Sequence, residues 1–131
     1  MMQSTTSEAV TKGVRVEVES RYHADRSAPQ QKHWFFSYTI RITNMGEKTV
    51  QLISRHWIIT DNTGHVDEVI GDGVVGEQPI LSPGQAFQYT SFCPLKTSKG
   101  TMRGTYQMKA TDGEEFDVEI APFALEQYTV H

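Results

Sequence analysis

The chain has 131 residues, 37% of them hydrophobic, and this length predicts one domain that buries roughly two thirds of its unfolded surface. Its 12 basic and 16 acidic residues give a formal net charge of −4 and are interleaved along the chain. A surface for nucleic acid or for an anionic membrane needs clustered Lys and Arg, so this pattern argues against both partners. No apolar run approaches the roughly 18 residues of a membrane span, and we expect no membrane insertion.

The first thirteen residues are polar and rich in Ser and Thr, without the apolar centre of a signal peptide. We therefore expect a flexible N-terminal arm over residues 1–13, followed by a single domain over residues 14–131. Cys93 is the only cysteine, so no internal disulfide can form. A lone cysteine suits a reducing compartment, and these features together favour a cytoplasmic protein.

Beyond the arm, apolar residues alternate with polar ones, which is the pattern of half-buried strands. The alternation starts over residues 14–19 and is clearest over residues 34–43, where Trp34 begins an apolar face. Shorter candidate strands follow at residues 50–53, 57–60 and 65–70. The later alternating residues are Phe87, Tyr89 and Ser91, then Tyr106 and Met108, then Phe116, Val118 and Ile120.

Turn-forming residues separate these predicted strands at residues 44–47, 61–64, 82–84 and 111–114. They supply the glycines and prolines that chain reversals need, and Asp112-Gly113 is the clearest hairpin signal. About seven short strands with such turns predict two packed antiparallel sheets. The expected fold is therefore an all-β sandwich of the immunoglobulin-like class.

Between two of these strands, Gly71, Gly73 and Gly76 spell the G-x-G-x-x-G of a dinucleotide-binding turn. That turn requires a helix directly after the glycines, because the helix N-terminus holds the pyrophosphate. Pro79 and the turn at residues 82–84 leave no room for a helix of useful length. The sequence therefore does not support a dinucleotide site.

We interpret the three glycines as structural: they let the chain cross tightly between strands while Ile70, Val74 and Val75 pack inward. The alternative is that free backbone N–H groups around the glycines form a concavity for phosphate or pyrophosphate. Asp72 and Glu77 place negative charge at this loop, which opposes an anion.

Several motifs occur together in a fixed order along the chain. They are Ser54-Arg55-His56-Trp57-Ile58-Ile59, then the glycine run up to Pro79, then Gly100-Thr101-Met102-Arg103-Gly104-Thr105-Tyr106. In these motifs the sequence resembles the bacterial ApaG family over residues 14–125. The resemblance implies a fibronectin type III-like sandwich and an association with cobalt resistance and magnesium efflux. It also implies a binding role, as supposed for related domains in larger eukaryotic proteins, and it supplies no catalytic residues.

Arg55 and Trp57 are candidates for a recognition surface, since both residue types are enriched at binding hot spots. Alternation places them on one face of a strand and His56 on the other. We favour a core position for Trp57, with Arg55 at the rim pairing with an acidic loop residue.

His65, Asp67 and Glu68 are the candidate metal ligands, and His65 and Asp67 share a strand face. Imidazole and carboxylate suit Co²⁺, and carboxylates suit Mg²⁺. A metal site needs three or four convergent ligands, so we favour solvated surface residues here.

No catalytic constellation stands out. Cys93 lies between Phe92 and Pro94, an apolar setting that predicts a buried, unreactive thiol. The serine-hydrolase elbow, the zinc-protease helix motif and the P-loop are absent from the sequence. We therefore expect no enzymatic activity and no cofactor, and a catalyst acting on phosphoanhydrides is the weakest of the hypotheses.

The leading hypothesis is a small non-enzymatic module that binds an unidentified protein partner and is linked indirectly to Co²⁺ and Mg²⁺ homeostasis. Its contact surface would involve Arg55, Gly71, Gly73 and Gly76 together with a sheet edge. The alternative is a small-ligand sensor for a phosphate compound or a divalent cation at the glycine loop. The tail over residues 122–131 is expected either to dock on its own domain or to support a homodimer.

Overall fold

Nine strands and two short 3-10 helices make up the part of the chain that the structure describes, residues 4–127 of a computed structural model. The strands are β1 (Ser4–Thr11), β2 (Val14–Tyr22), β3 (Trp34–Asn44), β4 (Val50–Asp61), β5 (Val66–Asp72), β6 (Ile80–Leu81), β7 (Ala86–Leu95), β8 (Lys99–Ala110) and β9 (Glu115–Glu126). The helices, η1 (Ala24–Arg26) and η2 (Pro29–Gln31), each have three residues, and neither helix of the described chain could cross a bilayer.

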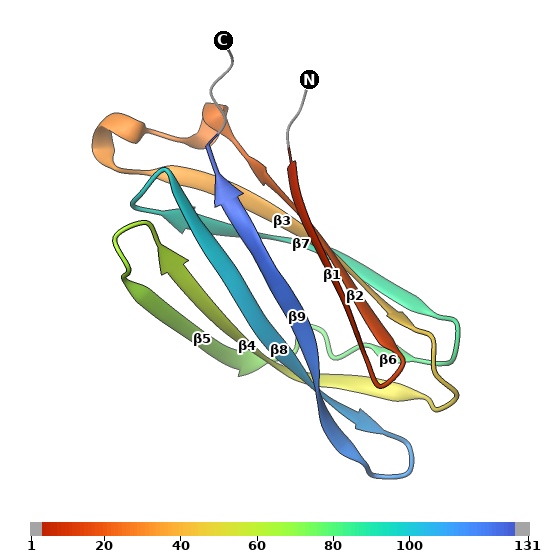
Figure 1. Ribbon diagram of the computed structural model, residues 1–131. Helices are drawn as coiled ribbons and strands as arrows, with labels where there is room; N and C mark the ends of the chain where they lie inside the picture. The colour runs from red at the N-terminus through yellow and green to blue at the C-terminus, as the bar shows by residue number, and fades with distance from the viewer. Residues whose placement is uncertain (1–3, 128–131) are drawn as a thin grey trace.

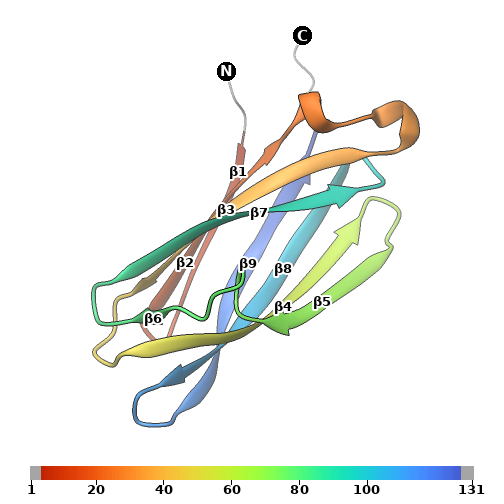
Figure 2. The same ribbon diagram turned by 180° about the vertical axis from the view of Figure 1, so that it is seen from behind.

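The strands form two antiparallel sheets that pack face to face (Figures 1 and 2). One sheet has the order β1-β2-β3-β7, and the other has the order β5-β4-β8-β9 with β6 paired to β4. This arrangement confirms the predicted all-β sandwich. The candidate strands at residues 50–53 and 57–60 are parts of one strand, β4, whose pairing with β8 is shifted by an irregularity between Leu52 and Ser54.

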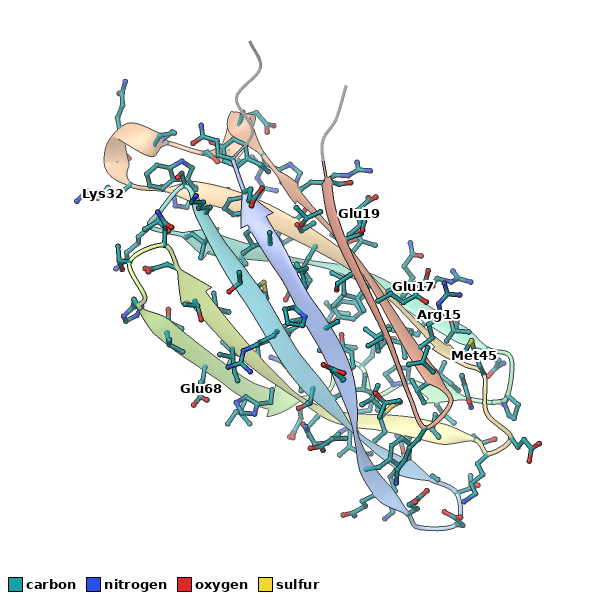
Figure 3. All side chains as sticks on the ribbon, viewed as in Figure 1. Arg15, Glu17, Glu19, Lys32, Met45 and Glu68 are labelled. Atoms are coloured by element: carbon teal, nitrogen blue, oxygen red, sulfur yellow. The ribbon has the colours of Figure 1, made fainter. Side chains whose placement is uncertain are left out.

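Alternation along the strands builds the core between the sheets. The inward residues of β2 and β3 are almost completely buried, as are those of β8 and β9. Two buried tyrosines from opposite sheets meet at the centre, where the hydroxyl oxygens of Tyr89 and Tyr106 lie 2.5 Å apart. On the outer face, Arg15 pairs with Glu8 at 2.7 Å and with Glu17 at 3.2 Å (Figure 3), as the interleaved charges of the sequence lead one to expect.

The N-terminal segment differs from the flexible arm predicted for residues 1–13. Residues 4–11 form β1, which pairs with β2 along its whole length, so the folded domain begins before residue 14. The inward residues of β1 are small or polar, and hydrophobic alternation therefore could not reveal the strand. These residues are Thr5, Ser7, Ala9 and Thr11.

Hydrogen bonds from the small side chains of β1 join this strand to β9 along one side of the sandwich. Ser7 Oγ donates to the carbonyl oxygen of Ala121 at 2.9 Å, and Thr5 Oγ1 donates to that of Ala124. The backbone N–H of Glu119 in turn donates to Thr11 Oγ1 at 3.1 Å. Two strands from different sheets are thus joined directly, and this side of the sandwich is closed.

The segment after residue 121 docks on its own domain. Phe123 is 3% exposed and Leu125 is fully buried, because both point inward from β9. Residues 128–131 lie outside the described chain, so Tyr128 takes no part in this result.

Candidate binding site

A cleft of about 520 Å³ opens between the sheets on the side opposite β1 and β9. Edge strand β5 of one sheet and edge strand β7 of the other form its two walls, and β3, β4 and β8 form its floor. The residues that line it include Tyr38, Arg55, Trp57, Asp67, Val69 and Cys93. The two sides of the sandwich therefore differ. Side chains join β1 to β9 on one side, whereas β5 and β7 line an opening on the other.

Cross-strand register decides which β5 side chains face this cleft. Ile59, Trp57 and Arg55 of β4 lie opposite Asp67, Val69 and Gly71 of β5. Residues directly opposite one another in a sheet share a face. Asp67 and Val69 therefore face inward, and both are nevertheless exposed, Val69 by 39%, because the cleft is open.

The other face of β5 carries Val66, Glu68 and Ile70 to the outside of the sheet. Ile70 is 73% exposed, so the expectation that it packs inward is wrong. The reason is the strand period of two, which sends Ile70 to the face opposite Val69 and Gly71. Figure 3 shows Glu68 projecting from this outer surface.

Arg55 holds the glycine loop by its backbone. Its Nη1 atom donates to the carbonyl oxygens of Asp72 and Gly73, each at 2.9 Å. The predicted pairing with an acidic side chain of the loop is therefore wrong. The guanidinium lies against Gly71, where an added Cβ atom would come within 2.9 Å of Nη1. Gly71 therefore leaves the space that the Arg55 guanidinium occupies.

Arg55 also lines the cleft, and two of its nitrogen atoms are left without a hydrogen-bond partner among the described residues. Its Nε and Nη2 atoms make no hydrogen bond to other residues in the described chain, and neither atom is buried there. Arg55 thus fixes the loop with one nitrogen, and as a lining residue it places its delocalised positive charge at the cleft.

The glycine loop uses its N–H groups within the fold. Val74 N donates to Glu77 O at 2.8 Å, Glu77 N donates to Val74 O at 2.9 Å, and Gly73 N donates to the carbonyl oxygen of Ile53 at 2.8 Å. The two residues between Val74 and Glu77 both have positive φ, as the central pair of a type I′ turn does. These N–H groups are therefore committed to carbonyl oxygens, which weakens the case for an anion concavity.

Two glycines of the loop occupy positions that disfavour a side chain. At Gly73 an added Cβ would lie 2.3 Å from the carbonyl oxygen of Glu77, and Gly76 has φ +80°. Val74 packs inward as expected, but Val75 is 55% exposed because it occupies the tip of the turn. The short strand β6 follows the loop, where a dinucleotide-binding fold would have a helix.

Trp57 belongs to the core, as predicted. It is 3% exposed and makes edge-on contacts with Tyr38 and Phe123, at ring-centroid distances of 5.3 and 6.0 Å. It forms part of the cleft floor between Arg55 and Ile59. Trp57 thus joins the core to the candidate site.

Comparison with known proteins identifies the family. The family model described as the ApaG domain matches residues 24–110. A Protein ApaG from Anaeromyxobacter dehalogenans is 56% identical over 119 residues, which cover 91% of this chain and 94% of that one. The chain belongs to the ApaG family.

Other relatives give the same result for the ApaG fold. A Protein ApaG from Rhodopseudomonas palustris is 51% identical over 118 residues, which cover 90% of this chain and 91% of that one. A crystal structure described as an ApaA protein from Bordetella pertussis aligns with a TM-score of 0.86 at 51% identity, over 90% of this chain and 97% of that one. None of these names states an enzymatic activity.

The candidate metal ligands of this ApaG domain, His65 just before β5 and Asp67 and Glu68 within it, do not lie on one face. His65 Nε2 lies 3.1 Å from Asp67 Oδ1, in a smaller pocket that adjoins the cleft and shares Asp67 with it. Glu68 points to the outer face, where its Oε1 atom is 3.4 Å from Nε2 of His56 without hydrogen-bond alignment. Within residues 4–127 no three His, Cys, Asp or Glu side chains converge on a common point.

Sequence reasoning did not unite the cleft residues of the ApaG domain, since they come from five different strands. Asp67 entered only as a candidate metal ligand, and Tyr38 and Val69 only as strand residues. One local signal was available: Ser91 is polar within the inward row of β7, between Tyr89 and Cys93, and it lines the cleft.

Cys93 is buried at the β7 wall, as predicted, with 5% of its surface exposed. Burial, with a smaller contribution from the nearby Asp67 carboxylate, raises the pKa of its thiol from 9.0 to about 12. The thiolate is the nucleophilic form, so this cysteine is unreactive at neutral pH.

The raised pKa of Cys93 makes the stability of the fold depend on pH. The unfolded chain loses the thiol proton near pH 9 and the folded chain only near pH 12, so the stabilisation is complete below pH 9 and is lost as the pH rises toward 12. From about pH 8 to pH 10, the free energy of unfolding, measured in urea, should fall by about 1 kcal/mol more in wild type than in Cys93→Ala. Equal losses in the two proteins would contradict a neutral buried thiol.

Proposed function

We propose that this ApaG-family chain is a small non-enzymatic binding module whose open side, β5 with the cleft and the Arg55-held loop, contacts a protein partner. The observation that carries the proposal is the composition of β5. This edge strand exposes Val66 by 52%, Val69 by 39% and Ile70 by 73%. Exposed apolar side chains beside unpaired backbone groups are features of a surface that another chain covers.

A chemical role has less support in the same region. The cleft holds one thiol, and its raised pKa makes it a poor nucleophile. His65 and Asp67 form a pair beside the cleft without a third ligand in the described chain. We therefore place any contribution to cobalt or magnesium tolerance with the bound partner, and the lone reduced cysteine supports action in the cytoplasm.

A photo-crosslinking amino acid placed on β5 tests the proposal inside cells. Introduced in place of Ile70, it should give a discrete protein adduct on irradiation. Introduced in place of Val10, which is 53% exposed on β1 at the closed side, it should give none. The adduct can contain a different protein or a second copy of this chain, and mass spectrometry identifies which.

Equal background labelling from both positions, with folded protein in each case, would overturn the assignment of the open side as the contact surface. Val10 is the matched control because it is also a strand residue with an exposed apolar side chain. Circular dichroism of both labelled proteins establishes that each remains folded.

A further inference from the structure

Strand β5 is an edge strand at the open side of the sandwich. It pairs with β4 on one side only, and its seven residues include neither Pro nor Lys. The one inward-pointing charge on β5, Asp67, disfavours an added strand that does not carry a compensating charge. Its pairing with β4 runs without a bulge from Ser54 to Thr60. The facing edge, β7, differs because Pro94 lacks an N–H group and interrupts its capacity to pair. Edges β1 and β9 are joined to each other by side-chain hydrogen bonds, so of the two edges at the open side β5 is the one expected to take an added strand.

The inner face of β5 has opposite charges at its two ends. Asp67 lies at one end, Val69 in the middle, and Gly71 at the other end, where the Arg55 guanidinium fills the missing side-chain space. The charged ends are four positions apart along the strand, about 13 Å at the usual strand rise. Read in the reverse direction, the same face presents positive charge, apolar side chain and negative charge.

This face is complementary to itself in an antiparallel arrangement. We propose that β5 pairs with β5 of a second copy of this chain, centred on Val69, so that the two five-stranded sheets become continuous across a twofold axis. The proposal rests on the proposed function, in which the β5 edge is a protein-contact surface. Asp67 of each copy then lies opposite Gly71 and the Arg55 charge of the other, and Val69 lies opposite Val69.

Symmetry and charge together select this register. The twofold axis of such an antiparallel pair is perpendicular to the sheet, so the inner faces of both copies lie on the same side. Inner residues must then lie opposite inner residues. This holds only if the register is centred on one residue of β5 and not between two residues. Centring on Asp67 or Glu68 places that carboxylate opposite itself, and centring on Ile70 places Glu68 opposite Asp72. Like charges directly opposite one another are destabilising. Centring on Val69 avoids each of these pairs and also pairs all seven residues of the strand.

The same register accounts for the exposed apolar residues of β5. Val69 side chains from the two copies meet at the axis on the inner face. On the outer face Ile70 lies opposite Glu68 of the second copy, and the two Ile70 side chains are diagonal neighbours at about 7–8 Å. Two exposed residues, Val69 and Ile70, thereby become partly covered by the second copy.

Disulfide trapping tests this register directly. Val69→Cys places two thiols opposite each other, where directly opposed Cβ atoms are about 5 Å apart and a small adjustment permits a disulfide. Mild oxidation should convert this variant to a covalent dimer at least about tenfold faster than Ile70→Cys or Val10→Cys. Wild type controls for Cys93, whose buried thiol should not react. Equal rates for Val69→Cys and Ile70→Cys would overturn the register.

Sedimentation equilibrium supplies a second readout that needs no new thiol. Asp67→Arg sets a cation against the Arg55 of the second copy and should weaken dimerisation at least about tenfold, whereas Val10→Lys at the closed side should leave it unchanged. A wild-type chain that remains monomeric at millimolar concentration would overturn the proposal. In that case self-pairing fails, but the proposed function still stands if the crosslinker at Ile70 captures a different protein in cells.

Discussion

Trp57→Ala is expected to lower the free energy of unfolding by about 3–5 kcal/mol, the range for truncating a buried aromatic residue. Trp57 is 3% exposed, and its indole contacts Tyr38 from one sheet and Phe123 from the other. Removing it leaves a cavity between the sheets at the floor of the cleft. Urea unfolding followed by circular dichroism measures the change.

A more conservative substitution at the same position separates packing from recognition. Trp57→Phe retains most of the apolar contact and should cost less than half as much stability. If Trp57 served mainly as an exposed recognition residue, Trp57→Ala would change stability by no more than about 0.5 kcal/mol, as surface substitutions do. That outcome would contradict its assignment to the core.

Gly104→Ala is expected to destabilise the fold by about 3 kcal/mol, at the upper end of the range for overpacking. A Cβ atom at Gly104 would lie 2.1 Å from the backbone carbonyl oxygen of His56 on β4. Backbone in the centre of a sheet cannot move aside as a flexible side chain can, so β4 and β8 must separate locally. Gly104 also lies opposite Trp57, which places the strain beside the core.

Gly46→Ala is the matched control for this prediction. Its added Cβ would have its nearest contact with Asn44 Oδ1 at 3.4 Å, an ordinary van der Waals distance. Thermal unfolding should therefore show a large loss for Gly104→Ala and little change for Gly46→Ala. Similar melting temperatures for the two variants would show that β8 yields easily at Gly104.

Sequence pattern predicted most of this fold because a sheet with one buried face leaves a period of two in its apolar residues. Residues 34–43 and 115–120 followed that rule and form β3 and part of β9. Strand β1 broke it, since Thr5 and Ser7 face inward and make hydrogen bonds to β9 in place of apolar contacts. No single-strand pattern reports a contact that depends on a strand more than a hundred residues away.

The candidate site was less predictable for a related reason. The motif containing Arg55 and the glycine run pointed to the right segments, but their contact depends on Arg55 lying opposite Gly71 in the β4–β5 register. That register decides that Arg55 contacts backbone carbonyl oxygens instead of the Asp72 carboxylate. It also decides that Asp67 faces the cleft while Glu68 faces away.

The contact between β1 and β9 also determines how this domain can be attached to other chains. Thr5, near the start of β1, touches Ala124, near the end of β9, so the two ends of the folded unit leave it side by side. They do so at the closed side, away from β5 and its cleft. A domain with adjacent ends can be inserted into a loop of a larger protein, or circularly permuted, with a short linker. Fusion through either end therefore leaves the proposed contact edge uncovered.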